Sequence, residues 1–287
     1  MLLGAGASVD YGLPVWKDLA SLIKEEINKD HGSLYQYKKE ILAWIEKVGE
    51  NKEYPTIDQC LQSESVSSEY HTNGLEIENQ ILLIIKNIFT KLYKENDGGW
   101  IRKLNTKILQ RPGLVNKMVF VNYNYDDVLE KNLLNFDHLP QKHKIINHRE
   151  RLDTLAHARI HALYPHGNLF SKAELPSPSH VARQMQTMKS GVGNYVDAVS
   201  CYESDSHNIS TDSYIPEVNL YLLGLGGGLE INLTNLVFEV PVSKIYVTIR
   251  DVSIKDRVLK FLSDKFEIPV DELVVYGTCA DLIDNCF

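Results

Sequence analysis

The chain has 287 residues, of which 44% are hydrophobic and 24% charged, and its formal net charge is -8. This composition is typical of a soluble globular protein, and the length allows one large domain or two small ones. The acidic balance disfavours nucleic acid as a partner, because a surface that binds nucleic-acid phosphates needs an excess of lysine and arginine. No apolar run reaches the roughly 20 residues of a membrane helix, and no leader pattern is present. We therefore expect a cytoplasmic protein without a membrane partner.

The first half of the chain predicts one short strand followed by helices. An apolar strand begins at Leu2 and runs into a turn of small residues, and an amphipathic helix follows over 14–28, with Pro14 in its first turn. Three more helices are predicted over 34–48, 75–93 and 98–109. We interpret residues 30–114 as a helical insertion. Because only Met1 precedes the first strand, either the protein begins further upstream or this strand lies at a sheet edge.

The second half of the chain alternates short apolar strands with helices. Strands are predicted over 117–122, 159–164, 218–223, 244–249 and 272–276, and helices over 126–135, 254–266 and 279–285. This alternation is typical of a parallel sheet covered by helices on both faces. We therefore predict an α/β fold, with a Rossmann-like doubly wound parallel sheet built from residues 1–29 and 115–287. Residues 168–216 have few regular features, and we interpret them as a lid or a further insertion.

Four cysteines are scattered along the chain: Cys60, Cys201, Cys279 and Cys286. No two of them are separated by two residues, so neither a zinc ribbon nor a redox CxxC motif is present, and reduced thiols are expected. His157 and His161 are four residues apart, but they lead into a predicted strand and no third ligand is spaced to match. We predict no metal site.

Unusual residues follow four of the predicted strands. These strand ends are Gly4-Ala5-Gly6-Ala7-Ser8, Asn122 to Asp127, Pro165-His166-Gly167-Asn168, and Gly224-Leu225-Gly226-Gly227-Gly228. In open parallel sheets, ligands bind at the carboxyl ends of the strands, near the switch in strand order. A turn between a strand and a helix also directs backbone N–H groups at one point, which suits a phosphate. The sequence therefore predicts a nucleotide site at this edge.

Together these motifs resemble the SIR2 (sirtuin-fold) family, in the same chain order and over nearly the whole length outside 30–114 and 168–216. The first motif is the most specific: Gly4-Ala5-Gly6, then Ser8, then Gly12-Leu13-Pro14. A dinucleotide fingerprint GxGxxG would require glycine at position 9, which is Val9, so that motif fits less well. The resemblance implies that the first segment cradles the pyrophosphate of NAD.

The resemblance also implies roles for individual residues, with NAD as the substrate. Asn124 would contact the nicotinamide ribose and position a water, Asp126 would hold the ribose, and His166 would act as general base. An imidazole, with a pKa near 6.5, can take a proton from a ribose hydroxyl or a water at neutral pH. The other residues expected to contact NAD are Gly4, Ala5, Gly6, Ser8, Pro14, Trp16, Gly167, Gly224 and Gly226.

Two departures from the family separate the chain from protein-deacetylating sirtuins. The paired CxxC motifs of their zinc module are absent, and Gly224 is not followed by the usual serine. The absence of the zinc module and the helical insertion look more like the bacterial SIR2-like NADases of anti-phage defence, and the layout is also similar to AbiH-type abortive-infection proteins. The resemblance therefore implies an NAD hydrolase that releases nicotinamide and ADP-ribose, with a homo-oligomer or a defence-system protein as partner. A non-catalytic NAD or ADP-ribose sensor and an NAD-dependent deacylase are the alternatives.

Each motif also has a purely structural interpretation. Gly4 and Gly6 would allow a tight turn, and the Gly226 to Gly228 run would allow close packing of a helix on a strand. Asn124 and Asp126 would be the N-cap and the first-turn acidic residue of the helix that follows them. Asp126 can both stabilise this helix and contact the ligand. Trp16 would either pack in the core or lie near the ligand. These alternatives remain open at this point.

Overall fold

The computed structural model describes residues 1–29, 35–49, 74–134, 136–138, 160–164, 169–170, 218–226, 229–234 and 241–287. Within these residues a 7-stranded sheet has the order β3-β4-β2-β1-β5-β6-β7, and all neighbouring strands are parallel. The predicted α/β class, with a parallel sheet and helices, is confirmed. Apart from residues 169 and 170, the predicted lid or insertion at 168–216 lies outside the described residues.

The strands are β1 (Leu2–Leu3), β2 (Val119–Asn122), β3 (Phe136–His138), β4 (Ile160–Leu163), β5 (Val218–Leu223), β6 (Val242–Thr248) and β7 (Val274–Tyr276). β1 lies in the interior of the sheet, because Leu3 pairs with Asn122 on one side and with Leu223 on the other. The expectation that it lies at a sheet edge is therefore wrong. β3, which lies at one edge of the sheet, was not predicted, because its three residues are too few to show an alternating pattern.

The α-helices are α1 (Trp16–Lys29), α2 (Lys38–Gly49), α5 (Gly74–Leu92), α6 (Trp100–Gln110), α7 (Val128–Asn132), α10 (Leu229–Thr234), α11 (Lys255–Phe266) and α12 (Cys279–Cys286). Four 3-10 helices join them within the described residues: η1 (Ala5–Tyr11), η2 (Pro112–Lys117), η4 (Val252–Ile254) and η5 (Val270–Glu272). Each of the seven helices predicted above has a counterpart, although Pro14 precedes α1 instead of lying in its first turn. α10 was not predicted, because its six residues are too short a window for a helical period.

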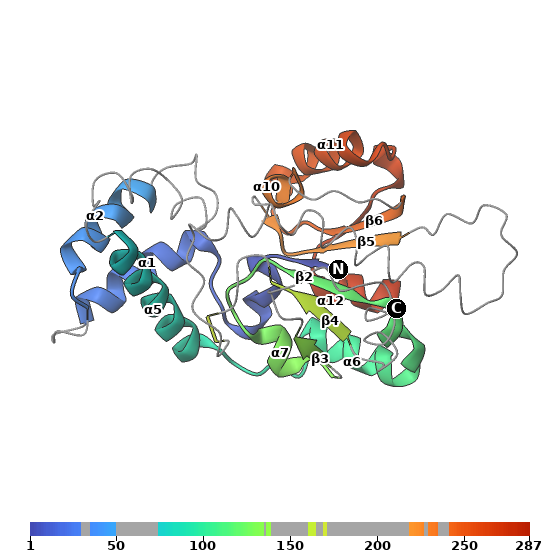
Figure 1. Cartoon of the computed structure of the whole chain (residues 1–287). Helices are drawn as coiled ribbons and strands as arrows, with labels where there is room; N and C mark the ends of the chain where they lie inside the picture. Colours follow the sequence, from blue (N-terminus) through green and yellow to red (C-terminus); the bar gives the residue numbers. More distant parts are fainter. Residues whose placement is uncertain are drawn as a thin grey trace, which may run out of the picture.

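Helices cover both faces of the sheet. Successive side chains of a strand point to opposite faces, so Leu2 and Leu3 belong to different apolar clusters. On one face, Leu2 and its neighbours pack against α10 and α11, whereas on the other face Leu3 packs among residues of α6 and α12. Figure 1 shows these two helix pairs above and below the strands. The central strands β1 and β2 are therefore covered on both faces, as their apolar runs predict.

α1, α2 and α5 pack on one another beside the sheet, and we call this group the helical lobe (Figure 1). Helix α6, which the sequence analysis assigned to the insertion, instead packs against α12 under the sheet. α1, which precedes residue 30, packs in the lobe against α5 and α2. The proposed boundaries of the insertion at 30 and 114 remain a prediction.

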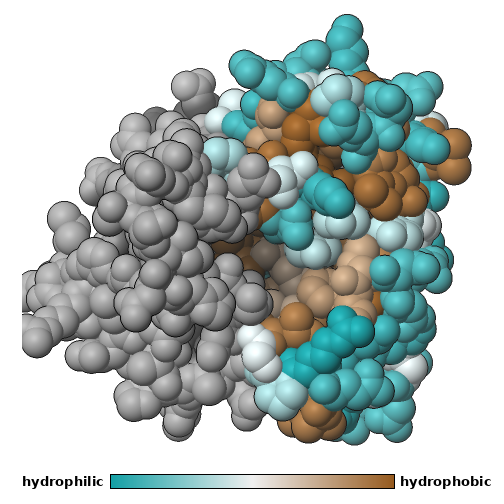
Figure 2. All heavy atoms as spheres, turned by 90° about the vertical axis from the view of Figure 1, so that its right-hand side faces the viewer, coloured by the Kyte–Doolittle hydropathy of each residue, from teal (hydrophilic) through white to brown (hydrophobic). Residues whose placement is uncertain are grey.

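The surface of the described residues is mixed. On the side of the molecule that faces away from the helical lobe, hydrophilic side chains lie mostly toward the outer margin and more apolar ones nearer the middle (Figure 2). None of the described helices combines the length and the hydropathy needed to cross a bilayer.

Candidate functional site

A cavity of about 680 Å³ lies at the carboxyl edge of the sheet. Its walls come from the residues that follow β1, β2, β5, β6 and β7, and from the first residues of α1 and Phe89 of α5. β1 pairs with β2 on one side and with β5 on the other, so the chain changes direction across the sheet at this point. Open parallel sheets bind ligands at such a switch point, and ligand pockets commonly enclose about 300–1,000 Å³.

Most of the predicted site residues line this cavity: Gly4, Ala5, Gly6, Pro14, Asn124, Asp126, Gly224 and Gly226. Ser8 is buried behind the turn and is not part of the lining. His166 and Gly167 lie outside the described residues, as do Gly227 and Gly228. Trp16 is the first residue of α1, but its side chain is not among those that the structure describes. The structure thus brings three of the four predicted strand ends to one cavity.

The glycine turns after β1 and β5 pack directly on each other. The N–H groups of Gly4 and Gly6 donate to the carbonyl oxygens of Leu223 and Gly224, at 2.9 and 2.8 Å. A Cβ on Gly4 would lie 2.6 Å from the Cα of Leu225, and a Cβ on Gly224 would lie 2.0 Å from the nitrogen of Ala7. Gly224 also has a φ of +64°, which favours glycine. The close approach of the two turns therefore requires Gly4 and Gly224, whereas at Gly226, for which close packing was the structural interpretation, a Cβ would meet nothing within 4 Å.

Because of this packing, the first turn has few backbone donors left for a ligand. Ala7 N–H donates to Gly4 O at 2.8 Å, so the N–H groups of Gly4, Gly6 and Ala7 are all used within the protein. Ala5 N–H donates no hydrogen bond to the described residues, and Ala5 is exposed at the cavity. The helix that follows is the 3-10 helix η1 of seven residues, whereas the amphipathic helix α1 starts only at Trp16. The predicted arrangement of a turn leading straight into α1 is wrong.

Helix α6 holds η1 in place from the opposite side. The indole nitrogen of Trp100 donates to the carbonyl of Ala7 at 2.7 Å, and both residues are buried. The Tyr11 hydroxyl accepts a hydrogen bond from the backbone N–H of Ile101 at 3.2 Å. A Cβ on Gly99 would lie 2.6 Å from that hydroxyl oxygen, so glycine is required at the start of α6. The turn beside the cavity is therefore fixed by α6 beneath it and β5 beside it.

A buried hydrogen-bond network joins three of the predicted residues, Ser8, Asn124 and Asp126. The side-chain amide of Asn124 donates to Gly4 O at 3.0 Å and to Ser8 Oγ at 3.1 Å. Ser8 also hydrogen-bonds the Asp126 side chain, and Asp126 Oδ1 accepts from the N–H of Val128 at 3.1 Å, at the start of α7. Asp126 thus both lines the cavity and supports the following helix, as the sequence analysis allowed.

The carboxyl group of Asp126 is buried at this cavity. Burial and, to a lesser degree, the charge of neighbouring Asp127 raise its pKa to about 6, whereas the hydrogen bonds from Ser8 and Val128 and the charge of Lys131 oppose the shift. The group is therefore mostly ionised at pH 7 and mostly neutral at pH 5. A titration in this range is typical of functional sites.

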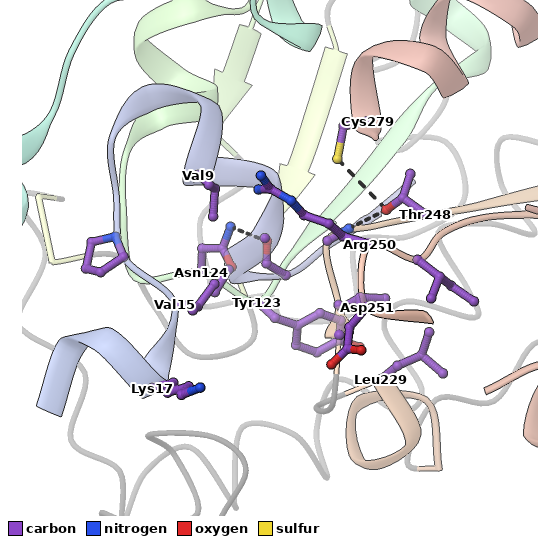
Figure 3. A pocket seen from close by; sticks show the side chains of 18 of the residues that line it. Val9, Val15, Lys17, Tyr123, Asn124, Leu229, Thr248, Arg250, Asp251 and Cys279 are labelled. Carbon is purple, nitrogen blue, oxygen red and sulfur yellow. Dashed lines mark hydrogen bonds between the residues drawn. The ribbon is translucent and has the colours of Figure 1, made fainter. Parts of the chain in front are cut away.

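The ends of β6 and β7 contribute cavity residues that the sequence analysis missed. Thr248 Oγ1 accepts a hydrogen bond from Gly224 N–H at 2.8 Å and lies 3.9 Å from the Cys279 sulfur (Figure 3). Burial raises the pKa of Cys279 to about 12, so the thiol stays protonated at neutral pH and is a poor nucleophile. Their position after a strand at the same edge was the only indication in the sequence. Cys279 and Cys286 form no disulfide, whereas Cys60 and Cys201 lie outside the described residues.

Five charged residues of the lining are exposed: Asp10, Lys17, Asp18, Arg250 and Asp251. Asp251 Oδ1 accepts from the Ser253 N–H at 2.9 Å and from its hydroxyl at 2.6 Å. These bonds, and to a lesser degree the charge of Lys17, lower the pKa of Asp251. Arg250 points from the end of β6 across the cavity toward Val9 of η1 (Figure 3). It makes no hydrogen bond or ion pair with any described residue.

The chain matches no known family model, and no curated protein matches it in sequence. The resemblance to the SIR2 family therefore stays a prediction from the sequence motifs. Among the described residues, no group of three or more His, Cys, Asp or Glu side chains is placed to hold a metal ion.

Proposed function

We propose that this protein binds NAD at the carboxyl edge of its sheet and hydrolyses the bond between nicotinamide and ribose. The observation that carries the proposal is that three motifs far apart in sequence, Gly4–Gly6, Asn124–Asp126 and Gly224–Gly226, line one cavity of about 680 Å³. Under this proposal the sheet is a Rossmann-like, doubly wound sheet of the sirtuin type. The match of motif order and fold class to one nucleotide-binding arrangement supports the proposal more than any single motif does.

His166 is the proposed general base, and its neighbours in the chain support that role. Tyr164, just after β4, is buried. Leu169 N–H donates to the carbonyl of Tyr125, a cavity residue, at 2.9 Å. His166 itself lies outside the described residues.

The proposed reaction consumes one water. The bond between ribose C1′ and the nicotinamide nitrogen breaks, and its electron pair leaves with the ring, which changes from a cation to neutral nicotinamide. The positive charge passes to an oxocarbenium-like ribose. A water oxygen bonds to C1′ while His166 accepts its proton, giving ADP-ribose. The cavity must therefore supply orientation, a base and exclusion of bulk water.

Asn124 and Asp126 would act through the atoms that the protein leaves available. The Nδ2 of Asn124 already donates to Gly4 and Ser8, so we assign the ribose or water contact to its carbonyl oxygen. Asp126, ionised above its pKa of about 6, would accept a hydrogen bond from a ribose hydroxyl and stabilise the positive sugar. Depletion of NAD by such a reaction would suit the anti-phage defence role that the resemblance implies.

The direct test is to incubate the purified protein with NAD and to separate nicotinamide and ADP-ribose by chromatography. The wild type should release both products in equal amounts, and His166→Ala should release neither while keeping the thermal unfolding temperature of the wild type. An acetyl-lysine peptide added in parallel should remain acetylated. Equal NAD loss in the wild type and in His166→Ala would refute the mechanism, and binding without cleavage by the wild type would support the sensor alternative.

A further inference from the structure

The pyrophosphate of the proposed ligand needs more hydrogen-bond donors than the first glycine turn provides. A dinucleotide carries two phosphate charges, but the N–H groups of Gly4, Gly6 and Ala7 already donate to carbonyl oxygens of the protein. Of that stretch, only Ala5 has an N–H without a described acceptor. η1 has seven residues in 3-10 geometry and so lacks the aligned dipole of a long α-helix. A positively charged side chain is therefore expected nearby.

We propose that Arg250 is the residue that binds the pyrophosphate, an inference that rests on the proposed dinucleotide ligand. Arg250 lines the cavity and points from the end of β6 across it toward Val9 of η1 (Figure 3). Its exposed guanidinium has no partner among the described residues. A guanidinium is always charged and offers five donors in a planar arrangement that matches phosphate oxygens. Arg250 thus supplies what the glycine turn lacks.

Lys17 is the other cation of the lining, and the geometry favours it less. Its charge acts on Asp251, which also lines the cavity, so that carboxylate already compensates part of it. An ammonium is also a point charge, which cannot bind two phosphate oxygens in one plane. Lys17 would therefore adjust the charge of the rim, whereas Arg250 would bind the ligand.

The acidic residues of the cavity make this cation more important. Asp10, Asp18, Asp126 and Asp251 belong to the lining. An anionic ligand would be repelled by these carboxylates unless a cation lies next to its phosphates. The loss of Arg250 should therefore lower the affinity for ligands that contain a pyrophosphate far more than the affinity for ligands that have none. The inference names the ligand class as adenosine diphosphates, including NAD and its product ADP-ribose.

The test compares Arg250→Ala and Arg250→Lys with the wild type by calorimetry, using ADP-ribose, ADP and adenosine as separate ligands. Arg111→Ala is the matched control, because Arg111 is exposed and does not line the cavity. Arg250→Ala should bind ADP-ribose and ADP about 10- to 100-fold more weakly, the effect of losing charge-assisted hydrogen bonds. Adenosine affinity and the unfolding temperature should match the wild type. Arg250→Lys should recover part of the loss, and the wild-type affinity for ADP-ribose should fall as salt is added.

The outcomes separate this inference from the proposed reaction. The inference is wrong, whether or not NAD is cleaved, if Arg250→Ala binds ADP-ribose as tightly as the wild type. It is also wrong if the affinity of this variant for adenosine falls as much as its affinity for ADP-ribose. If the wild type binds ADP-ribose through Arg250 but leaves NAD intact, hydrolysis is wrong and the inference stands. A wild type that binds neither ADP-ribose nor ADP overturns both.

Discussion

The side-chain amide of Asn124 donates a hydrogen bond of 3.0 Å to the carbonyl oxygen of Gly4, and so connects the ends of β2 and β1. The same amide nitrogen lies 3.1 Å from Ser8 Oγ. Asn124 is 7% exposed, so water cannot easily replace these two bonds. The residue assigned to the ligand by its motif is therefore also the residue that fixes the shape of the first turn.

Replacing Asn124 with alanine should lower the stability of the fold as well as any ligand affinity. Two buried hydrogen bonds would be lost, one to the hydroxyl of Ser8 and one to the carbonyl of Gly4, which would keep the Ala7 N–H as a donor. The expected cost is about 1–3 kcal/mol in the free energy of unfolding. Urea denaturation would measure the loss. Asn285→Ala is the control, because the Asn285 amide donates to Asp281 at an exposed site. If both variants unfold at the same urea concentration, the buried network has no special role.

Gly224 and Gly226 should respond differently to alanine. Both have positive φ, +64° and +49°, but a Cβ on Gly224 would lie 2.0 Å from Ala7 nitrogen, whereas one on Gly226 meets nothing within 4 Å. Gly226→Ala should therefore cost only the strain of its backbone, about 1 kcal/mol. Gly224→Ala should separate the two turns, lowering the unfolding temperature by several degrees more and abolishing ligand binding. Equal melting temperatures for the two variants would contradict the packing described here.

Thr248 should contribute to the stability of the fold through its hydroxyl group rather than through the volume of its side chain. Its Oγ1 accepts from Gly224 N–H at 2.8 Å and donates to Leu222 O at 3.3 Å. Thr248→Val keeps the volume but leaves that N–H without its acceptor, which should cost about 1–3 kcal/mol. Thr248→Ser keeps the hydroxyl and should be closer to the wild type. Chemical denaturation of the two variants would measure the difference. If Thr248→Ser is less stable than Thr248→Val, packing of the side chain matters more than its hydrogen bonds.

Stability should depend on pH through Asp126. Its folded pKa of about 6 lies above the ordinary value of 3.8, so between these values the native state holds a proton that the unfolded chain has released. Stability contributed by the protonated form is therefore lost as the pH rises from about 4 to 6. Asp126→Asn does not titrate, so its stability relative to the wild type should increase over that window by about 1–3 kcal/mol and then level off.

Denaturation of Asp126→Asn and of the wild type at about pH 4 and about pH 7.5 would measure this difference. Asp281→Asn is the control, because Asp281 is exposed. A difference between Asp126→Asn and the wild type that is the same at both pH values would mean that Asp126 does not titrate as described.

The elements of the sheet could be predicted where the sequence carries a repeated physical pattern. Leu19, Ile23 and Ile27 recur every four residues and are all buried on one side of α1. β2, β5 and β6 are apolar runs between helices, as a sheet covered on both faces requires. β3 and α10 were missed because each is shorter than the window in which a period can be recognised.

The site could be predicted only in part. Gly4, Asn124 and Gly224 were found because small or Asx residues after a strand are unusual, and the cavity brings them together. The sequence could not show that the N–H groups of Gly4 and Gly6 donate hydrogen bonds to carbonyl oxygens at the end of β5. These bonds depend on how closely two turns, distant in sequence, approach each other. Arg250 and Thr248 belong to no motif, and only the rule that ligands bind at strand ends would have indicated them.

The most direct test of the whole account is a crystal structure of the protein grown with ADP-ribose. Electron density for the ligand should fill the cavity, with its pyrophosphate within hydrogen-bond distance of Arg250 and the Ala5 N–H, and with its ribose beside Asp126 and His166. Density for the ligand elsewhere, or a His166 side chain directed away from the ribose, would contradict the account.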